Sequence, residues 1–319
     1  MGLFDFIGKF LGTSAPETAS TKAASNAPAS PYANQNYYIK KAVYLKYYLG
    51  QNENQLKEFR PEYNTFQIPK RSGGARTINE PKPETKALQH KILRMLRNGN
   101  THKCAVGFRR GRGIVHNAIP HVGKAVVLKM DIRNFFPSVT REKCVTAIMQ
   151  TGWEKGAAEI LADICCLNGG LPQGAPTSPL LSNIANTRLD CRLYGLAKKL
   201  STGTQKVDYT RYADDITFSF ATDEPGLVRG VITLIFQILH EEGYQVNKKK
   251  TRVMRQHQRQ TVTGLVVNET INIPRKQRRK IRAAMHRISV GEEPTLTNEQ
   301  LQGWMGMLSL VQKGKEEYL

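Results

Sequence analysis

The chain has 319 residues, of which 40% are hydrophobic, and carries 47 Lys and Arg against 26 Asp and Glu, a formal net charge of +21. This length accommodates one large domain, or a domain with a smaller lobe. The charge surplus predicts a polyanionic partner and favours nucleic acid over acidic lipid or a merely soluble basic protein. No apolar run is long enough to span a membrane. Five cysteines without a Cys-x-x-Cys pair indicate reduced thiols in a cytoplasmic protein.

Residues 1–36 are predicted to be an N-terminal amphipathic piece followed by a flexible linker. The first 11 residues lack the length and the cleavage site of a signal peptide. Phe6 stands where a myristoylation signal has Ser or Thr, so lipidation is not expected. We expect a local docking helix here, with membrane contact as the alternative. Residues 12–34 are rich in Ala, Ser, Thr, Pro and Asn and cannot bury enough surface to order themselves.

Three elements are predicted between residues 37 and 97. Residues 37–49 and 84–97 show the helical spacing of apolar side chains. Between them, residues 66–78 predict a β-hairpin around a Gly-Gly turn, with basic residues at its tip. The expected apolar stripe of the first helix consists of Tyr38, Val43, Tyr44, Tyr47 and Leu49.

The middle of the chain alternates strands and helices. Residues 125–130 form an apolar strand that ends at Asp131. Two runs of period-two hydrophobicity, 207–212 and 216–220, flank Ala-Asp-Asp and predict a hairpin with acids at its turn. Helices are predicted at 140–151, 154–167, 177–199 and 225–242, and short strands near 244–247, 261–267 and 271–273.

Two helices are predicted to close the chain. Pro274 can start the first, with Ile281, Met285 and Ile288 as its buried stripe. A capping box from Thr297 to Gln300 marks the start of the second. The other face of the first helix is basic, which predicts a surface that follows phosphates rather than reads bases. Its cations are Arg275, Lys276, Arg278, Arg279 and Arg282.

The candidate catalytic residues are three acids at strand ends. Asp131 ends one apolar strand, and Asp214 and Asp215 lie at the hairpin turn about 80 residues later. Phosphoryl transfer by the two-metal route needs carboxylates that converge on two Mg²⁺ ions, and a group of carboxylates buried together without a cation is unfavourable. An Asp-Asp pair alone would favour an ordinary turn, because Asp is common in turns.

The surrounding motifs resemble those of reverse transcriptases. Tyr-Ala-Asp-Asp at 212–215 is similar to the catalytic hairpin of that family, and residues 130–138 resemble its first metal-binding motif. Residues 171–179, with Leu-Pro-Gln-Gly, resemble the motif that shapes the nucleotide pocket, and residues 243–251 and 262–265 follow in the family's order. The resemblance covers about residues 40 to 312. It implies two Mg²⁺ ions held by Asp131, Asp214 and Asp215.

The fold that the resemblance implies is α+β, a right-hand polymerase fold. Fingers and a palm, an antiparallel sheet backed by helices, are expected at residues 37–273. A short helical thumb is expected at residues 274–319.

The resemblance also assigns a nucleotide pocket for deoxynucleoside triphosphates. Phe136 corresponds to the side chain that packs against the sugar C2′ and excludes a 2′-hydroxyl. Gln173 and Gly174 resemble the pair beneath the incoming nucleotide, where Gly allows the backbone to approach closely.

Three cations are expected around the phosphates of that nucleotide. Lys70 and Arg76 on the hairpin are expected to grip the triphosphate, with Arg71 competing with Lys70 for that role. Lys250 fits a lysine near the leaving pyrophosphate, a possible proton donor. The alternative for Lys250 is membership of a solvated basic run.

Residues 117–121 (Asn-Ala-Ile-Pro-His), together with 262–264, resemble the paired signature of bacterial retron reverse transcriptases. Asn117 and His121 are therefore expected to contact RNA, with packing and a fold-supporting hydrogen bond as the alternative. A metal role for the histidine is not expected, because no third ligand is near.

The retron resemblance also implies partners. They are a cognate structured noncoding RNA with its DNA copy, primed from an internal guanosine 2′-hydroxyl to give a branched hybrid, and an accessory effector protein in antiphage defence. The alternatives are another bacterial reverse transcriptase with different priming and a catalytically idle RNA-binding scaffold.

Overall fold

The computed structural model describes residues 39–70 and 73–318. The predictions for residues 1–36, for Tyr38 and for Arg71 therefore fall outside the described residues. Within the described ranges, no helix combines the length and the apolar character that a membrane crossing requires.

A four-stranded antiparallel sheet lies at the centre of the fold, in the order β4-β5-β3-β6. Its strands are β3 (Val126–Asp131), β4 (Val207–Tyr212), β5 (Asp215–Phe220) and β6 (Arg252–Arg255). β4 and β5 are joined by a two-residue turn, and β3 pairs with β5 so that Asp131 lies opposite Asp215. The strands of the predicted acidic hairpin are therefore confirmed, and one end of the sheet gathers the acids.

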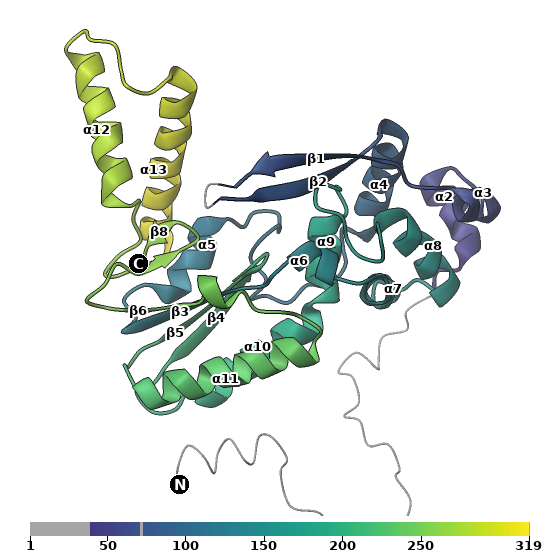
Figure 1. The fold of residues 1–319 in the computed structure, drawn as a ribbon, viewed down its shortest axis with the longest axis horizontal. Coiled ribbons are helices and arrows are strands. Elements are labelled where there is room, and N and C mark those ends of the chain that lie inside the picture. The colour runs from purple at the N-terminus through teal and green to yellow at the C-terminus, as the bar shows by residue number, and fades with distance from the viewer. Residues whose placement is uncertain (1–38, 71–72, 319) are drawn as a thin grey trace, which may run out of the picture.

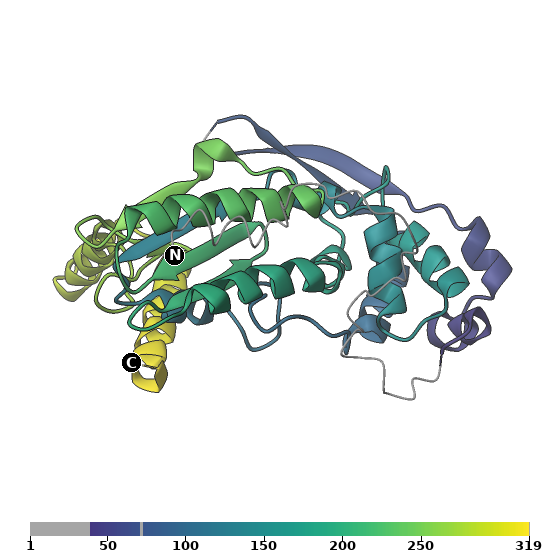
Figure 2. The ribbon, with the colours of Figure 1, turned by 90° about the horizontal axis from the view of Figure 1, so that it is seen from below.

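Two long helices, α10 (Thr187–Leu200) and α11 (Pro225–Glu241), cover one face of the sheet (Figures 1 and 2). Leu193 of α10 and Ile235 of α11 are fully buried, as are Leu128, Phe218 and Phe220 of the strands. Each buried side chain of this size contributes about 1.5–3 kcal/mol by leaving water. The α+β class and the antiparallel sheet backed by helices are confirmed.

A smaller core lies on the other face of the sheet, around Val127. It is formed by α5 (Ile114–Ala118), the 3₁₀ helix η2 (Ile119–His121) and the hairpin of β7 (Thr261–Val262) and β8 (Leu265–Val266). Thr263 and Gly264 make the turn of that hairpin, with φ of 46° and 85°. The predicted strand at 261–267 is thus two short strands with a turn between them.

A helical region adjoins the sheet end that carries the acids. It contains the 3₁₀ helix η1 (Ala42–Tyr44) and α2 (Leu45–Leu49), α3 (Glu53–Glu58), α4 (Pro83–Leu96), α6 (Phe135–Ser138), α7 (Arg141–Met149), α8 (Lys155–Cys165) and α9 (Ser178–Ala185). The antiparallel hairpin of β1 (Tyr63–Pro69) and β2 (Ala75–Pro81) extends from this region above the sheet (Figure 1).

The last two helices, α12 (Arg275–Ser289) and α13 (Asn298–Tyr318), form a pair that rises from the sheet end away from α2 (Figure 1). The predicted capping box is confirmed: Gln300 N donates to Thr297 Oγ1, and Thr297 N donates to Gln300 Oε1, both at 3.3 Å. The predicted stripe of α12 is partly wrong. Ile281 is buried, but Met285 and Ile288 are about half exposed, and Ala284 completes the inner face.

Three further predictions are wrong in detail. The inner face of residues 42–49 consists of Ala42, Leu45 and Leu49, while Val43, Tyr44 and Tyr47 are exposed. Residues 244–247 form no strand, and their contact with the sheet is an isolated β-bridge from Val246 to Ile132. The strand that pairs with β3 on this side of the sheet is β6 instead. The single helix expected at 177–199 is two helices, α9 and α10, which meet at Asn186, whose ψ of 10° departs from helical geometry.

Candidate active site

The β3 end and the β4–β5 turn bring the three predicted aspartates together. Asp131 is the last residue of β3 and faces Asp215, the first residue of β5, in the strand register. Asp214 is held next to them because Ile132 N donates to its carbonyl at 3.0 Å. The preceding residue, Ala213, has a left-handed φ of 57°, which makes the tight turn possible.

Charge is concentrated at this turn. Lys250 Nζ donates to Asp131 Oδ2 at 2.7 Å, and Lys129 Nζ lies 3.4 Å from Asp215 Oδ2. Burial, together with the negative charges of Asp215 and Asp131, raises the pKa of Asp214 to about 6. The hydrogen bond to Asp131 raises the pKa of Lys250, which keeps its ammonium charged. The site therefore holds three acids that repel one another and two lysines that partly neutralise them.

The donor chemistry of this turn fits Mg²⁺, which prefers carboxylate oxygens. In the part of the chain that the structure describes, no three His, Cys, Asp or Glu side chains converge on a single point as ligands would. Asp131 and Asp215 instead point at their lysines. What favours a cation is the meeting of the three carboxylates at one sheet end: burial, and then the negative charges of Asp215 and Asp131, raise the pKa of Asp214, and positive charge relieves both effects.

The loop with Leu-Pro-Gln-Gly contacts the β1–β2 hairpin through its backbone. Asn79 N on β2 donates to the Gln173 carbonyl at 2.8 Å. Gly174 has a φ of 127°, and a Cβ there would lie 2.8 Å from the Asn79 carbonyl oxygen. Only glycine fits here, because the hairpin backbone approaches so closely; the approach of Gly174 to a nucleotide stays a prediction.

The other residues predicted for the nucleotide pocket lie on two separate elements. Phe136 in α6 is half-buried and packs against Phe135, with ring centroids 5.4 Å apart. Lys70 and Arg76 lie toward the tip of the hairpin and are exposed. Neither forms an ion pair with another described residue, so both are available to an anionic ligand.

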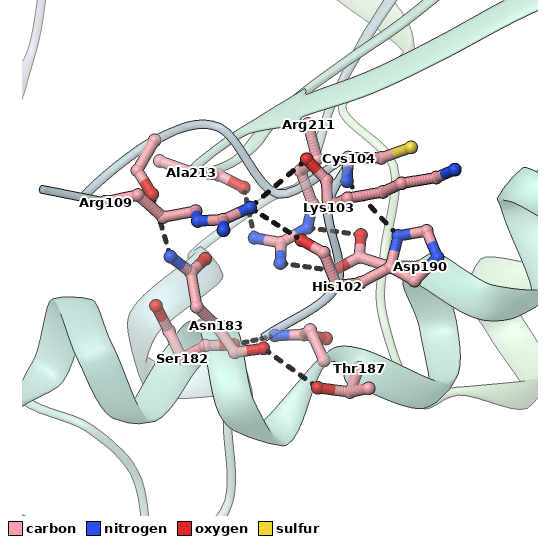
Figure 3. Close-up of polar contacts among 12 residues, drawn as sticks. His102, Lys103, Cys104, Arg109, Ser182, Asn183, Thr187, Asp190, Arg211 and Ala213 are labelled. Atoms are coloured by element: carbon pink, nitrogen blue, oxygen red, sulfur yellow. Dashed lines mark hydrogen bonds and ion pairs between the residues drawn. The ribbon is translucent and has the colours of Figure 1, made fainter. Parts of the chain in front are cut away.

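A buried ion pair supports the acidic turn from behind, and the sequence motifs do not indicate it (Figure 3). Arg211 on β4 donates through Nε and Nη2 to the two oxygens of Asp190 on α10, at 2.8 and 2.7 Å, and both side chains are fully buried. Its third nitrogen, Nη1, donates to the Ala213 carbonyl at 3.2 Å. Tyr209 Oη donates to Asp190 Oδ1 at 2.7 Å. The guanidinium thus ties α10 to the residue before Asp214. In the sequence, the only sign of this ion pair is Arg211 itself, a charged residue within a strand that is half apolar.

A loop that precedes α5 packs on the same turn. Val106 N donates to the Arg211 carbonyl at 2.8 Å, and Asn183 Nδ2 on α9 donates to the Gly107 carbonyl at 2.7 Å. A Cβ on Gly107 would lie 2.8 Å from Ala213 N. Position 107 therefore requires glycine, and the loop links α9 to the acidic turn.

The prediction that Asn117 and His121 contact RNA is wrong for these side chains, because both are completely buried. His121 Nδ1 lies 2.7 Å from Ser219 Oγ and Nε2 lies 2.8 Å from Thr210 Oγ1. Burial lowers the pKa of His121 to about 3, so its ring is neutral at pH 7. The histidine joins η2 to β4 and β5 and supports the fold.

The predicted basic face of α12 is on the surface. Arg278 is half-buried and the other four cations are exposed. Among the described residues, none of the five forms a salt bridge; the one ion pair of this helix joins Arg287 to Glu292. The helix therefore presents uncompensated positive charge, carried by Arg275, Lys276, Arg278, Arg279 and Arg282.

Comparison with known proteins identifies the class. Residues 68–268 match the family model described as "Reverse transcriptase (RNA-dependent DNA polymerase)", and the chain belongs to this family. The sheet with its acidic hairpin and backing helices is accordingly the right-hand polymerase fold expected from the motifs.

Similarity to curated relatives places the chain among the retron-type reverse transcriptases. The chain is 37% identical over 276 residues to the Retron Mx65 reverse transcriptase of Myxococcus xanthus, a match that covers 81% of this chain and 63% of that protein. It is 36% identical over 238 residues to the Retron Ec86 reverse transcriptase of Escherichia coli, covering 74% of this chain and 72% of that one. The chain thus spans less than two thirds of the Mx65 protein's length. Among solved structures, telomerase from Candida albicans is similar with a TM-score of 0.48 and 14% identity, over 73% of this chain and 48% of that one.

Proposed function

We propose that this chain is the RNA-directed DNA polymerase of a retron and that it adds deoxynucleotides by two-metal nucleotidyl transfer. The observation that carries the proposal is the meeting of Asp131 with Asp214 and Asp215 at one sheet end, where the pKa of Asp214 is raised to about 6. Carboxylates that repel one another in this way are suited to hold cations. Asp131, Asp214 and Asp215 would hold two Mg²⁺ ions, which when bound supply activation of the attacking hydroxyl and stabilisation of the leaving pyrophosphate.

The chain's own side chains would bind and orient the nucleotide around that centre. Phe136 would exclude a 2′-hydroxyl, and Gln173 with Gly174 would lie under the incoming base and sugar. Lys70 and Arg76, which form no ion pair with a described residue, would bind the triphosphate. Lys250, whose ammonium stays charged beside Asp131, would face the pyrophosphate and could donate a proton to it.

The chain would consist of fingers, palm and thumb subdomains with separate roles. Residues 37–273 would form fingers and palm, with the β1–β2 hairpin as part of the fingers, and residues 274–319 would form the thumb. The uncompensated basic face of α12 supports this division, because a row of cations on one helix suits the phosphates of a template–product duplex.

The retron relatives support a specific substrate. The RNA would be a cognate structured noncoding RNA, copied in part into DNA from the 2′-hydroxyl of one internal guanosine, so that a branched RNA–DNA hybrid remains with the protein. An accessory effector protein and a role in antiphage defence in the cytoplasm belong to the same proposal.

Primer extension on an RNA template with a DNA primer tests the polymerase proposal. Asp131→Asn and Asp214→Asn should each lower the rate by roughly a thousandfold or more, since loss of a metal ligand removes several kcal/mol of transition-state stabilisation. Asp163→Asn is the matched control: Asp163 is an exposed acid on α8 that pairs with Arg141, and its loss should leave the rate unchanged. Rates within about tenfold of wild type for the first two variants would refute the assignment.

The priming chemistry needs a separate experiment. An inverted-repeat noncoding RNA sought beside the gene would be synthesised with guanosine or with 2′-deoxyguanosine at the branch position. DNA synthesis on the first RNA and none on the second, with equal extension of an annealed DNA primer on both, is the expected result. Equal self-primed synthesis on both RNAs would assign the chain a different priming mode.

A further inference from the structure

The outer face of η1 and α2 carries large side chains that do not serve the core. Tyr47 is 86% exposed, Val43 70% and Tyr44 53%. The rings of Tyr47 and Tyr48 lie edge to face with centroids 5.4 Å apart. The inner face of the same segment is the one that packs toward α4. A cluster of exposed rings on a well-packed short helix indicates a binding surface.

A polar cavity of about 390 Å³ is lined in part by Tyr48, whose ring contacts that of Tyr47. Lys91 is anchored at its rim by donating to the Leu49 carbonyl at 2.7 Å. The cavity combines three cations with a tyrosine and no carboxylate, and its lining is Lys40, Tyr48, Lys91, Arg94, Met95 and Asn98. In the described ranges, none of these cations is in a salt bridge. The cavity therefore offers positive charge that no described carboxylate neutralises.

This surface is remote from the acidic turn. α2 lies at one end of the molecule and the pair α12–α13 lies at the other, and the sheet lies nearer to that pair than to α2 (Figures 1 and 2). A ligand held here would not compete with a nucleotide at the aspartates or with a duplex on α12.

We propose that this α2–α4 surface binds unpaired nucleotides of RNA. It is defined by Lys40, Tyr44, Tyr47, Tyr48, Lys91 and Arg94. Exposed tyrosine rings can stack on splayed bases, and cations beside them can neutralise the intervening phosphates. The exposed rings of Tyr44 and Tyr47 favour a single strand, since bases in a duplex are already stacked. The inference rests on the proposed function only in that the natural ligand would be a non-template part of the cognate RNA.

The test measures fluorescence anisotropy of a labelled, mixed-sequence single-stranded RNA of about 16 nucleotides with the full chain. Excess unlabelled duplex DNA is present to occupy the basic face of α12. Tyr44→Ala/Tyr47→Ala should weaken binding roughly tenfold, whereas the matched control Tyr44→Phe/Tyr47→Phe keeps the rings and should stay within about twofold of wild type. Tyr48 is left in place because its ring contacts Trp153.

A second pair of variants tests the cations. Lys40→Gln/Arg94→Gln should flatten the slope of log affinity against log salt by up to about 1.4 units, since each phosphate of a single strand that is no longer neutralised lowers the slope by about 0.7. Lys206→Gln/Arg229→Gln changes the net charge equally at exposed positions away from this surface and should leave the slope unchanged.

Three outcomes would overturn the inference. One is equal RNA affinity for the alanine and phenylalanine pairs. Another is a lower melting temperature of the alanine pair with unchanged RNA affinity, which would mean that the chain itself covers the rings. The third is dissociation of an oligomer by the alanine pair, again with unchanged RNA affinity, which would assign the surface to a second copy or a protein partner.

Primer extension by the same variants on a generic template separates this inference from the proposed function. The alanine pair should extend an annealed primer at the wild-type rate. A wild-type chain that extends no primer would remove the proposed polymerase function and leave the RNA-binding result standing.

Discussion

The rings of Phe108 and Phe136 lie 5.9 Å apart, centroid to centroid, and at 35° to each other. Phe108 also approaches Tyr212 at 6.4 Å, so it bridges the element that carries Phe136 and the strand that leads into the acidic turn. Two left-handed residues, Phe108 itself (φ 64°) and Asn134 (φ 48°), bring these segments into place. Phe136 is thus held between Phe108 and Phe135, and because it is only half-buried, part of its ring is available to a ligand.

If Phe136 excludes the 2′-hydroxyl, Phe136→Ala should admit ribonucleotides. We expect the ratio of kcat/KM for dGTP to that for GTP to fall by roughly tenfold or more, a change of about 1.4 kcal/mol in discrimination. Phe108→Ala is the matched control, because it removes the neighbouring ring and leaves the sugar position filled. An unchanged ratio in Phe136→Ala would make Phe136 a packing residue only.

The buried pair of Arg211 and Asp190 should position the acidic turn. Arg211→Met alone leaves the buried carboxylate of Asp190 without its positive partner and should lower the free energy of unfolding by about 3–5 kcal/mol. Asp190→Leu/Arg211→Met removes both charges and should recover most of that stability, but it also removes the hydrogen bond to the Ala213 carbonyl. Denaturant unfolding, with primer extension titrated against Mg²⁺, separates the two effects. The double variant should remain folded and require more Mg²⁺ for half-maximal rate. A folded double variant with the wild-type Mg²⁺ midpoint would restrict the pair to a structural role.

The basic face of α12 should dominate affinity for duplexes. Neutralising its first four cations should weaken binding to any duplex and flatten the slope of log affinity against log salt by up to about four units. Salt-dependent anisotropy with an RNA–DNA hybrid measures this. The matched control neutralises four exposed cations elsewhere, and an equal effect there would show that net charge alone is responsible. The α12 variant changes Arg275, Lys276, Arg278 and Arg279, and the control variant changes Lys57, Lys155, Lys206 and Arg229.

His121 should make the protein sensitive to acid. Its pKa in the folded chain is about 3, against 6.5 for a free imidazole, so the unfolded chain takes up a proton first. The stability it provides is complete above pH 6.5 and is lost as pH falls toward 3, up to about 5 kcal/mol in all. Denaturant midpoints between pH 7 and pH 4 should fall more steeply for wild type than for His121→Gln, which cannot titrate.

The His121→Gln variant also tests whether residues 117–121 recognise the cognate RNA. Because His121 is buried between Ser219 and Thr210, His121→Gln should lower primer extension on a generic template and on the cognate RNA together. A selective loss on the cognate RNA would instead support the prediction that this segment distinguishes RNAs.

The sequence predicted those parts of the fold in which local pattern and tertiary environment agree. The runs around Asp214 and Asp215 alternate because they are strands with two different faces, and β3 is apolar because both of its faces are covered. β6 was missed because its four residues begin and end with Arg, and only pairing with β3 makes them a strand. The stripe at 43–47 was misassigned because exposed tyrosines have the same spacing as buried ones.

The same distinction applies to the active site: residues in a local motif could be predicted, and contacts between distant segments could not. The aspartates could be found because they follow strands in a motif, and their convergence is a matter of register. The pairing of Arg211 with Asp190, and the glycine at 107 that lets the loop reach Ala213 N, depend on contacts between distant segments. No periodicity or local propensity encodes such contacts. The burial of Asn117 and His121 is of the same kind, since a motif places residues along the chain but not at the surface.

The hydrogen bond from Asn79 to Gln173 has a consequence for how the protein is made. The hairpin emerges from the ribosome early, yet the loop that receives it, ending at Gly174, is synthesised 95 residues later. At about 5–20 residues per second, the hairpin waits roughly 5 to 20 s without its docking site. Its strands are exposed along most of their length, and unpaired edges of this kind are prone to pair with other chains. Slow synthesis should therefore favour aggregation of this chain, and a chaperone that shields the nascent hairpin should raise its yield.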